Sequence, residues 1–440
     1  MSVQAGSDAQ SRTRRVFSRI GLAGLPFQVY VMLVVGLVFS FGRSLAFPYL
    51  AMYMSGKSAG GGLEIDPSLV GFILMMGGFA YILALLVTGN LCDRFGRRKL
   101  MLLFVIPQIF LTLGYAFARV FSEFLALYVA TSVLSAFYDP AQSAMIADLV
   151  QPNRREEVYG LSYMISNIPV VISPPIGGLL ATANGYPILF LYATVFMAAG
   201  AVTVLFLIHE SYSGGAQTSV SVGQLASVFR DRVFILFCFL GAMTNLVYSQ
   251  LYGLLSIYTS YVGLPPYAFG ILFSVNGAMV VALQIPIRKG AVRIGSAKTF
   301  IIAQLLFAAG FMYFTFSREF YQFLTGAIIL TLGEITFMPA SSGFTANQSP
   351  VDMRGRYQAM SGLFLGVGGS VGTLIGFRLY DVLVSKELIW AVLGTIGFAT
   401  LPGYAYLLKI QNKTGMKEGK VVDSVSRDEK QRTQLVRIRT

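Results

Sequence analysis

Long apolar runs, separated by short polar segments, repeat along the whole chain. Each run holds about 18 to 28 mostly apolar residues, enough for a helix to cross about 30 Å of hydrocarbon. The runs are continuous, whereas the strands of a membrane β-barrel alternate in short segments. The pattern predicts twelve membrane spans, at residues 28–53, 68–90, 100–118, 123–148, 158–182, 187–208, 233–261, 267–287, 299–316, 321–346, 358–380 and 389–408.

The composition agrees with this interpretation. The 440 residues are 55% hydrophobic and only 12% charged, with a mean hydropathy of +0.67, which is too apolar for a soluble domain. We therefore expect an all-α membrane protein. No nucleotide-binding loop, metal-ligand cluster or nucleophilic triad is present in the sequence, so we expect neither an enzyme nor a cofactor.

The positive charges predict the orientation of the spans. An even number of spans places both termini on one side, and 27 of the 33 Lys and Arg residues fall on that side. Because short basic loops are retained in the cytoplasm, we expect cytoplasmic termini in a multi-pass protein of the cell inner membrane. The net charge of +13 then marks orientation and contact with anionic lipid, and it predicts no nucleic-acid partner.

The chain carries an internal duplication. A shift of 199 residues aligns Arg94, Gly96 and Lys99 with Arg293, Gly295 and Lys298, and it aligns Pro140 with Pro339. We therefore expect two six-helix halves. The predicted divisions are a cytoplasmic N-terminal segment at 1–27, a first half at 28–209, a cytoplasmic linker at 210–232, a second half at 233–408 and a disordered tail at 409–440.

The stretch from Gly89 to Lys99 is the most polar segment between two spans. It holds four cations, one carboxylate and two glycines, and we expect it to be an eleven-residue turn. It resembles the G-x-x-x-D-[RK]-x-G-[RK]-[RK]-[RK] signature between spans two and three of the major facilitator superfamily, and it fits all seven specified positions. Within that superfamily the chain looks like the twelve-span drug:proton antiporters.

The resemblance implies a role for this stretch beyond orientation. If the family arrangement holds, Asp93 lies where span eleven begins, and a carboxylate stabilises a helix start. Arg94 or Arg97 could pair with Asp148 at the end of span four. We expect a conformational latch that holds the halves together when the transporter faces out, formed by Gly89, Asp93, Arg94, Gly96, Arg97 and Asp148. The alternative is a basic loop kept only for orientation.

Three ionisable residues lie well inside predicted spans, namely Arg43, Asp139 and Glu334. A charge at such a depth costs roughly 2.5 to 3.5 kcal/mol on insertion scales, so each must face a cavity or a partner. The resemblance implies that spans one, four, seven and ten line a central cavity, and all three residues fall on those spans. We expect Glu334 to carry the coupled proton, with Asp139 as second candidate; alternatively, Arg43 and Asp139 form a fixed structural pair.

Polar and aromatic residues on the same spans, and on span eight, are candidates for substrate contact. The expected substrate-cavity residues are Arg43, Tyr138, Gln142, Asn245, Tyr248, Gln250 and Asn276. Near the end of span eleven, Arg378 and Asp381 are one helical turn apart. They are expected to pair with each other or with lipid headgroups, or else to form an extracellular gate contact.

These features predict a proton-coupled secondary transporter that exports lipophilic or amphipathic small molecules by alternating access. The expected partners are a small-molecule substrate, protons and the bilayer, with the proton gradient as energy source and the chain acting as a monomer. One alternative is a transporter of one specific polar or anionic metabolite, which Arg43 would favour. Another is a membrane scaffold or sensor that does not transport.

Overall fold

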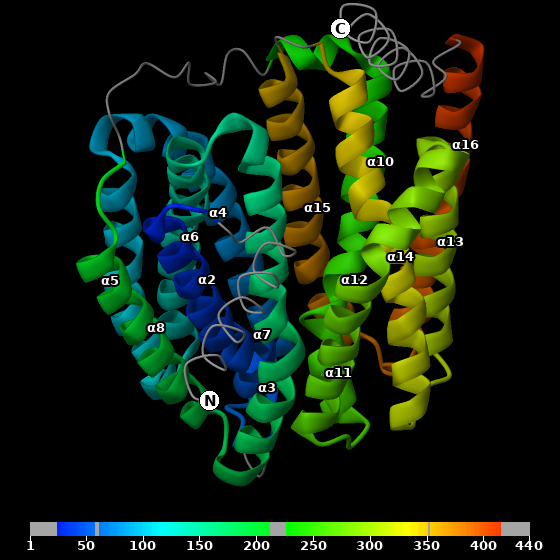
Figure 1. The fold of residues 1–440 in the computed structure, drawn as a ribbon. Helices are drawn as coiled ribbons and strands as arrows, with labels where there is room; N and C mark the ends of the chain where they lie inside the picture. The colour runs from blue at the N-terminus through cyan, green and yellow to red at the C-terminus, as the bar shows by residue number, and fades with distance from the viewer. Residues whose placement is uncertain (1–23, 58–60, 212–225, 351–352, 415–440) are drawn as a thin grey trace, which may run out of the picture.

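The structure is a computed structural model that describes residues 24–57, 61–211, 226–350 and 353–414 (Figure 1). It is all-helical over these residues and contains twelve helices long and apolar enough to cross a membrane, which confirms the predicted fold class. The predicted N-terminal segment and tail lie almost entirely outside the described residues, as does most of the linker.

The first six spans are formed by residues 27–207. Their helices are α2 (Phe27–Ala46) continued by η1 (Phe47–Tyr49) and α3 (Leu50–Ser55), α4 (Pro67–Phe95), α5 (Arg97–Phe117), α6 (Phe121–Leu149), α7 (Arg155–Asn184) and α8 (Pro187–Leu207).

The second six spans are formed by residues 232–414. Their helices are α10 (Arg232–Tyr248) continued by η5 (Ser249–Leu251) and α11 (Leu254–Tyr261), α12 (Pro266–Ile294), α13 (Ser296–Phe314), α14 (Phe320–Gln348), α15 (Arg354–Val382) and α16 (Leu388–Thr414). In both groups a short 3-10 turn interrupts the first span, which the hydropathy pattern does not reveal.

The expected eleven-residue turn is wrong in its extent. Helix α4 continues to Phe95 and α5 begins at Arg97, so Gly96 alone separates them. Gly96 has φ +86°, and Gly295, 199 residues later, separates α12 from α13 with φ +87°. This region of backbone space is open to glycine and strained for other residues. The duplication therefore extends to the backbone geometry of both corners.

The two groups of helices contact each other along three helix pairs, α4 with α15, α7 with α12, and α3 with α11. We call the end of the bundle near Gly96 and Gly295 the motif end, and the end near Asp66 and Asp381 the far end. Contacts between the halves run from the far end to mid-depth. They include Gly71 against Phe377, and Ile82 against Gly366.

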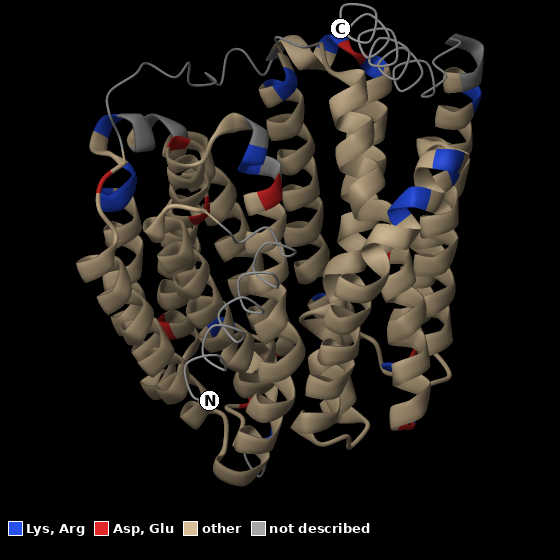
Figure 2. Cartoon of the chain, viewed as in Figure 1, with Lys and Arg blue, Asp and Glu red and all other residues tan. Residues whose placement is uncertain are grey.

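Toward the motif end the inner helices lie apart. Four glycines there, Gly160, Gly290, Gly343 and Gly362, have no atom within 4 Å of the position that a Cβ would take. They belong to α7, α12, α14 and α15, which contact other helices closely nearer the far end. The structure is therefore closed at the far end and open at the motif end. Charged residues gather at the motif end as well (Figure 2).

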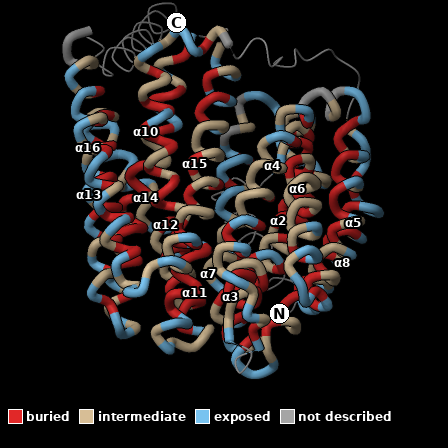
Figure 3. Tube along the Cα trace, turned by 180° about the vertical axis from the view of Figure 1, so that it is seen from behind, coloured by how far each residue is buried: buried red, intermediate tan, exposed pale blue. Residues whose placement is uncertain are grey.

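Buried residues lie where the helices face one another (Figure 3). The one tryptophan, Trp390 at the start of α16, is fully buried. Its ring stacks on Phe311 with an interplanar angle of 12° and meets Tyr258 and Phe314 edge to face. Large apolar side chains such as Phe110 and Phe206 stay exposed on the outer surface, as expected for helices that face lipid.

Candidate functional site

A cavity of about 540 Å³, here called the central cavity, lies between the two halves. The first half contributes Arg43 from α2 with Tyr163 and Asn167 from α7. The second half contributes Asn276 from α12 and Glu334 from α14. Aromatic side chains, including Phe47, Tyr252 and Phe273, complete a wall that combines an apolar surface with charges of both signs.

Glu334 is held by a set of polar side chains within the second half. The Asn276 Nδ2 group donates a hydrogen bond of 2.7 Å to Glu334 Oε2 and another of 3.0 Å to Thr331 Oγ1. The Tyr248 hydroxyl interacts with the same carboxyl group and is hydrogen-bonded to Tyr252. Glu334 is the one charged residue of α14, and these contacts give its carboxyl group hydrogen-bond partners beside the central cavity.

A second cavity, of about 390 Å³, extends from Arg43 into the first half and is here called the side cavity. Its lining includes Tyr138, Asp139 and Gln142 from α6, together with Tyr81 from α4. Arg43 lines both cavities. Asp139 and Arg43 attract each other electrostatically, but no ion pair within 4.0 Å joins these two described residues. The fixed Arg43–Asp139 pair is absent from this conformation.

Three of the expected cavity residues, Asn245, Tyr248 and Gln250, are outside both linings, and Tyr248 contacts Glu334 instead. Asn245 Nδ2 donates to the Leu365 carbonyl at 2.7 Å, and Gln250 Nε2 donates to the Gly372 carbonyl at 2.8 Å. Asn245 therefore ties α10 to α15, and Gln250 ties the η5 turn to α15. The reason is that α15 presents glycines toward them, Gly369 to Asn245 and Gly376 to Gln250, so polar side chains of α10 and η5 reach its backbone.

Among the lining residues that were not singled out from the sequence are Tyr163, Asn167 and Tyr81. Tyr163 and Asn167 are four residues apart on the fifth span, and the Asn167 Nδ2 group donates to the Tyr163 carbonyl at 2.8 Å. Polar side chains one helical turn apart within an apolar span are a signal that they share a face, so this pair was detectable.

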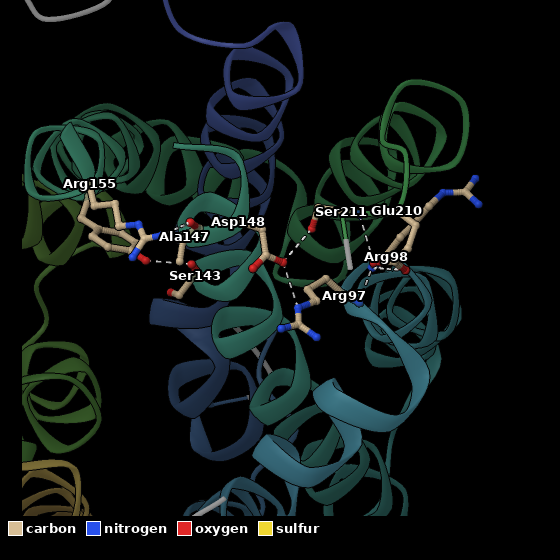
Figure 4. A network of polar contacts seen from close by, with 9 residues as sticks. Arg97, Arg98, Ser143, Ala147, Asp148, Arg155, Glu210 and Ser211 are labelled. Atoms are coloured by element: carbon tan, nitrogen blue, oxygen red, sulfur yellow. Dashed lines mark hydrogen bonds and ion pairs between the residues drawn. The ribbon is translucent and has the colours of Figure 1, made fainter. Parts of the chain in front are cut away.

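The signature stretch forms a polar corner within the first half (Figure 4). Arg97 Nε lies 3.1 Å from Asp148 Oδ2, and the Arg97 side chain is only 3% exposed. Of the two arginines proposed as partners of Asp148, Arg97 is the one in contact, whereas Arg94 stacks over the Phe95 ring. The side chain of Asp93 lies outside the described part of the structure, so its expected contact with span eleven stays a prediction.

A carboxylate that the sequence did not single out caps this corner. Glu210 Oε1 accepts a hydrogen bond of 3.0 Å from the Arg97 backbone N–H, and its Oε2 accepts one of 3.2 Å from the Arg98 N–H (Figure 4). These are free N–H groups of the first turn of α5, where negative charge is favourable. The neighbouring Ser211 hydroxyl donates to Asp148 at 3.0 Å. The residues after α8 are thus fixed to the signature corner.

Two bundles of six membrane-spanning helices, with a charged cavity between them that is closed toward one end, define a secondary transporter of the alternating-access class. The model of the Major Facilitator Superfamily matches residues 32–296 and 252–420. The chain belongs to that superfamily, whose members are transporters and not enzymes.

Two relatives whose function is named have low sequence identity to this chain but match most of its length. The chain is 25% identical over 398 residues to a "Na(+), Li(+), K(+)/H(+) antiporter" of Planococcus maritimus, covering 82% of this chain and 91% of the relative. It is 26% identical over 390 residues to the "Multidrug resistance protein MdtH" of Photorhabdus laumondii, covering 84% and 92%. A crystal structure of a peptide transporter POT in complex with sulfate has a TM-score of 0.75 at 17% identity, covering 89% and 96%, and shows the same fold.

Proposed function

We propose that the protein is a proton-coupled exporter of lipophilic or amphipathic small molecules. The observation that carries this proposal is Glu334, a carboxyl group at mid-span that faces the cavity between the halves. The aromatic lining of the same cavity suits molecules with an apolar body. The multidrug-resistance and proton-antiporter names of the two relatives support the same assignment.

Glu334 is the first candidate for the proton carrier. In the present conformation it faces a cavity on the motif-end side of the closed contacts, so it can exchange a proton with that side. When the halves rock about the cavity, the same carboxyl group becomes reachable from the far end. Asp139 is the second candidate, since it is reached through the side cavity and lies in the field of Arg43.

The test is substrate-driven proton movement in proteoliposomes with a panel of cationic, neutral and anionic compounds, including Na⁺, Li⁺ and K⁺. Glu334→Gln is expected to lower proton movement at least tenfold while substrate binding persists, because the glutamine keeps the shape but cannot release a proton. Asp139→Asn tests the second candidate, and Glu387→Gln at the far-end surface is the matched control. Undiminished proton-driven transport by the Glu334→Gln variant would remove Glu334 from the mechanism.

One observation favours a second candidate function, the transport of a specific anionic metabolite. The Arg43 guanidinium lines both cavities and makes no ion pair with a described residue, so a substrate carboxylate or phosphate would find an available cation there. Coupling to one anionic compound of the panel, lost in Arg43→Gln, would select this function. Binding without any transport would point to a scaffold or sensor.

The proposal includes the expected setting of the molecule. We place it as a monomer in the cell inner membrane with both termini in the cytoplasm, so that the motif end faces the cytoplasm. The structure then represents an inward-open state. A latch formed by Asp93 belongs to the opposite, outward-open state, in which the motif end is closed.

A further inference from the structure

The far end carries a polar contact between the halves that the transport cycle proposed above does not use. Ser68 Oγ at the start of α4 donates a hydrogen bond of 2.6 Å to Asp381 Oδ2 near the end of α15. Arg378 Nη1 lies 3.3 Å from the same carboxylate and 3.2 Å from the Ser68 hydroxyl. The Asp66 carboxyl, two residues before Ser68, is close enough to Asp381 for the two carboxyl groups to influence each other's charge.

Two neighbouring carboxyl groups repel or attract each other, depending on whether they share a proton. With both ionised they repel each other, whereas one shared proton converts the contact into a hydrogen bond. Asp66 belongs to the first half and Asp381 to the second, where α4 packs on α15. The repulsion or the hydrogen bond therefore acts directly on the closure of the far end.

We propose that Asp66 and Asp381 form a proton-binding site that fastens the far end shut when the solution on that side is acidic. The site is separate from Glu334 in the cavity, so this inference goes beyond the proposed transport function. According to this inference, the pH on the far-end side directly shifts the equilibrium between the closed and the open far end.

The electrostatics give the sign of the effect. Burial, and after it the neighbouring Asp381 carboxylate, raise the pKa of Asp66 in this closed state, against the opposing influence of Arg378. When the far end opens, the carboxyls separate and the pKa of Asp66 returns toward that of a free aspartate. Protonation thus favours closure: the stabilisation is complete below the pKa of the separated group and is lost as pH rises through the closed-state pKa.

Other charged and titratable groups also surround the pair. Arg378 lies 3.3 Å from the Asp381 carboxylate, and the Lys386 ammonium group lies 3.4 Å from the Asp381 carbonyl oxygen. Lys57 and Glu64 belong to the loop before α4, and Tyr261 of α11 meets Tyr380 beside Asp381. Glu64 is the remaining carboxyl on that loop and needs its own control.

The experiment measures far-end opening in the full chain in lipid nanodiscs, without substrate or a proton gradient. Spin labels are placed at Val120 and Val384, exposed far-end positions of opposite halves, after Cys92→Ser and Cys238→Ser remove the native thiols. In the wild type, the closed-to-open ratio should fall as the pH is raised from the ordinary aspartate pKa of 3.8 toward neutrality, about tenfold for each unit by which closure raises the pKa. Asp66→Asn and Asp381→Asn should each abolish most of this change, whereas Glu64→Gln and Glu387→Gln should keep it.

Wild-type pH dependence in both Asp66→Asn and Asp381→Asn would overturn the proposal. A pH dependence that disappears in Glu334→Gln but persists in Asp66→Asn would also overturn it, and would assign the switch to the cavity carboxyl. Asp66→Ser provides a second variant if the asparagine variant is poorly folded. Because the readout is a distance and not transport, failure here leaves the proposed function untouched, and failure of proton coupling leaves the far-end site untouched.

Discussion

Arg97 shows how a single buried cation organises the signature corner. Its side chain is 3% exposed, yet its partner Asp148 keeps 24% exposure, so the ion pair lies at the edge between protein and solvent. Glu210 adds two backbone hydrogen bonds from the other side. The corner is thereby held by opposite charges from α6, from the start of α5 and from the residues that follow α8.

Asp148→Asn is expected to destabilise the protein by about 1–3 kcal/mol, because it removes the negative partner of a buried guanidinium. The measurement is the apparent Tm of the purified protein in detergent. Glu157→Gln is the matched control, since its ion pair with Arg154 is exposed and should contribute only about 0–1 kcal/mol. Equal Tm values for the two variants would contradict a structural role for the buried pair.

Single residues also mark the limit of inference from the sequence. Arg43, Asp139 and Glu334 could be found because a charge inside an apolar span needs a cavity or partner, and the structure places all three on cavities. Glu210 could not be found in this way. It lies at a polar span end, where a carboxylate is unremarkable, and its partners are 112 and 113 residues away in the chain.

At the scale of elements, α15 is held to its own half by closely packed glycines. A Cβ at Gly368 would lie 2.1 Å from the Ala242 carbonyl oxygen, and one at Gly372 would lie 2.4 Å from that of Leu246. These carbonyls belong to α10. The glycines at these positions therefore fix α15 to α10, whereas Gly366, beside Ile82, belongs to the surface that meets the other half.

Gly372→Ala is expected to lower stability by about 1–3 kcal/mol, because the added methyl group meets backbone atoms that cannot rotate away. Gly362→Ala on the same helix is the matched control. No atom lies within 4 Å of its added Cβ, and alanine favours the helix by up to about 1 kcal/mol. Denaturant unfolding of both variants checks the contrast, which is refuted if Gly372→Ala is as stable as Gly362→Ala.

Spans and their order could be predicted from hydropathy, because the bilayer demands long apolar helices. Their exact ends could not. The stretch from Gly89 to Phe95 is largely polar, yet it is helical. A helix can extend beyond the hydrocarbon into the interface, whereas a hydropathy pattern detects only the segment that crosses the hydrocarbon. The breaks at Phe47–Tyr49 and Ser249–Leu251 are three residues each inside long apolar spans, so they are too short to interrupt that pattern.

At the scale of the whole molecule, closure at the far end and opening at the motif end are two aspects of one arrangement of rigid halves. The halves meet from the far end to mid-depth, where Ser274 donates a hydrogen bond to the Val171 carbonyl. Which way the molecule faces could not be inferred from the sequence, because the same side chains serve both orientations of the halves.

A cross-link between the halves should stop transport. In Gly78→Cys/Ser370→Cys, the Cβ built at residue 78 lies 3.0 Å from that of residue 370, close enough for a disulfide after a small adjustment. With Cys92 and Cys238 replaced by serine, oxidation is expected to abolish transport in proteoliposomes, and a reductant should restore it. Gly160→Cys/Gly362→Cys at the open motif end is the control. Full transport by the oxidised Gly78→Cys/Ser370→Cys variant would exclude rocking at this contact.

Trp390 gives the molecule an intrinsic optical probe. Because it is the only tryptophan of the chain and is enclosed by Phe311, Phe314 and Tyr258, emission excited at the red edge of its absorption band comes from the second half alone. A chemical denaturation followed by this signal records the loss of that half. The same titration followed by circular dichroism records the helices of both, so any offset between the two curves measures how independently the halves unfold.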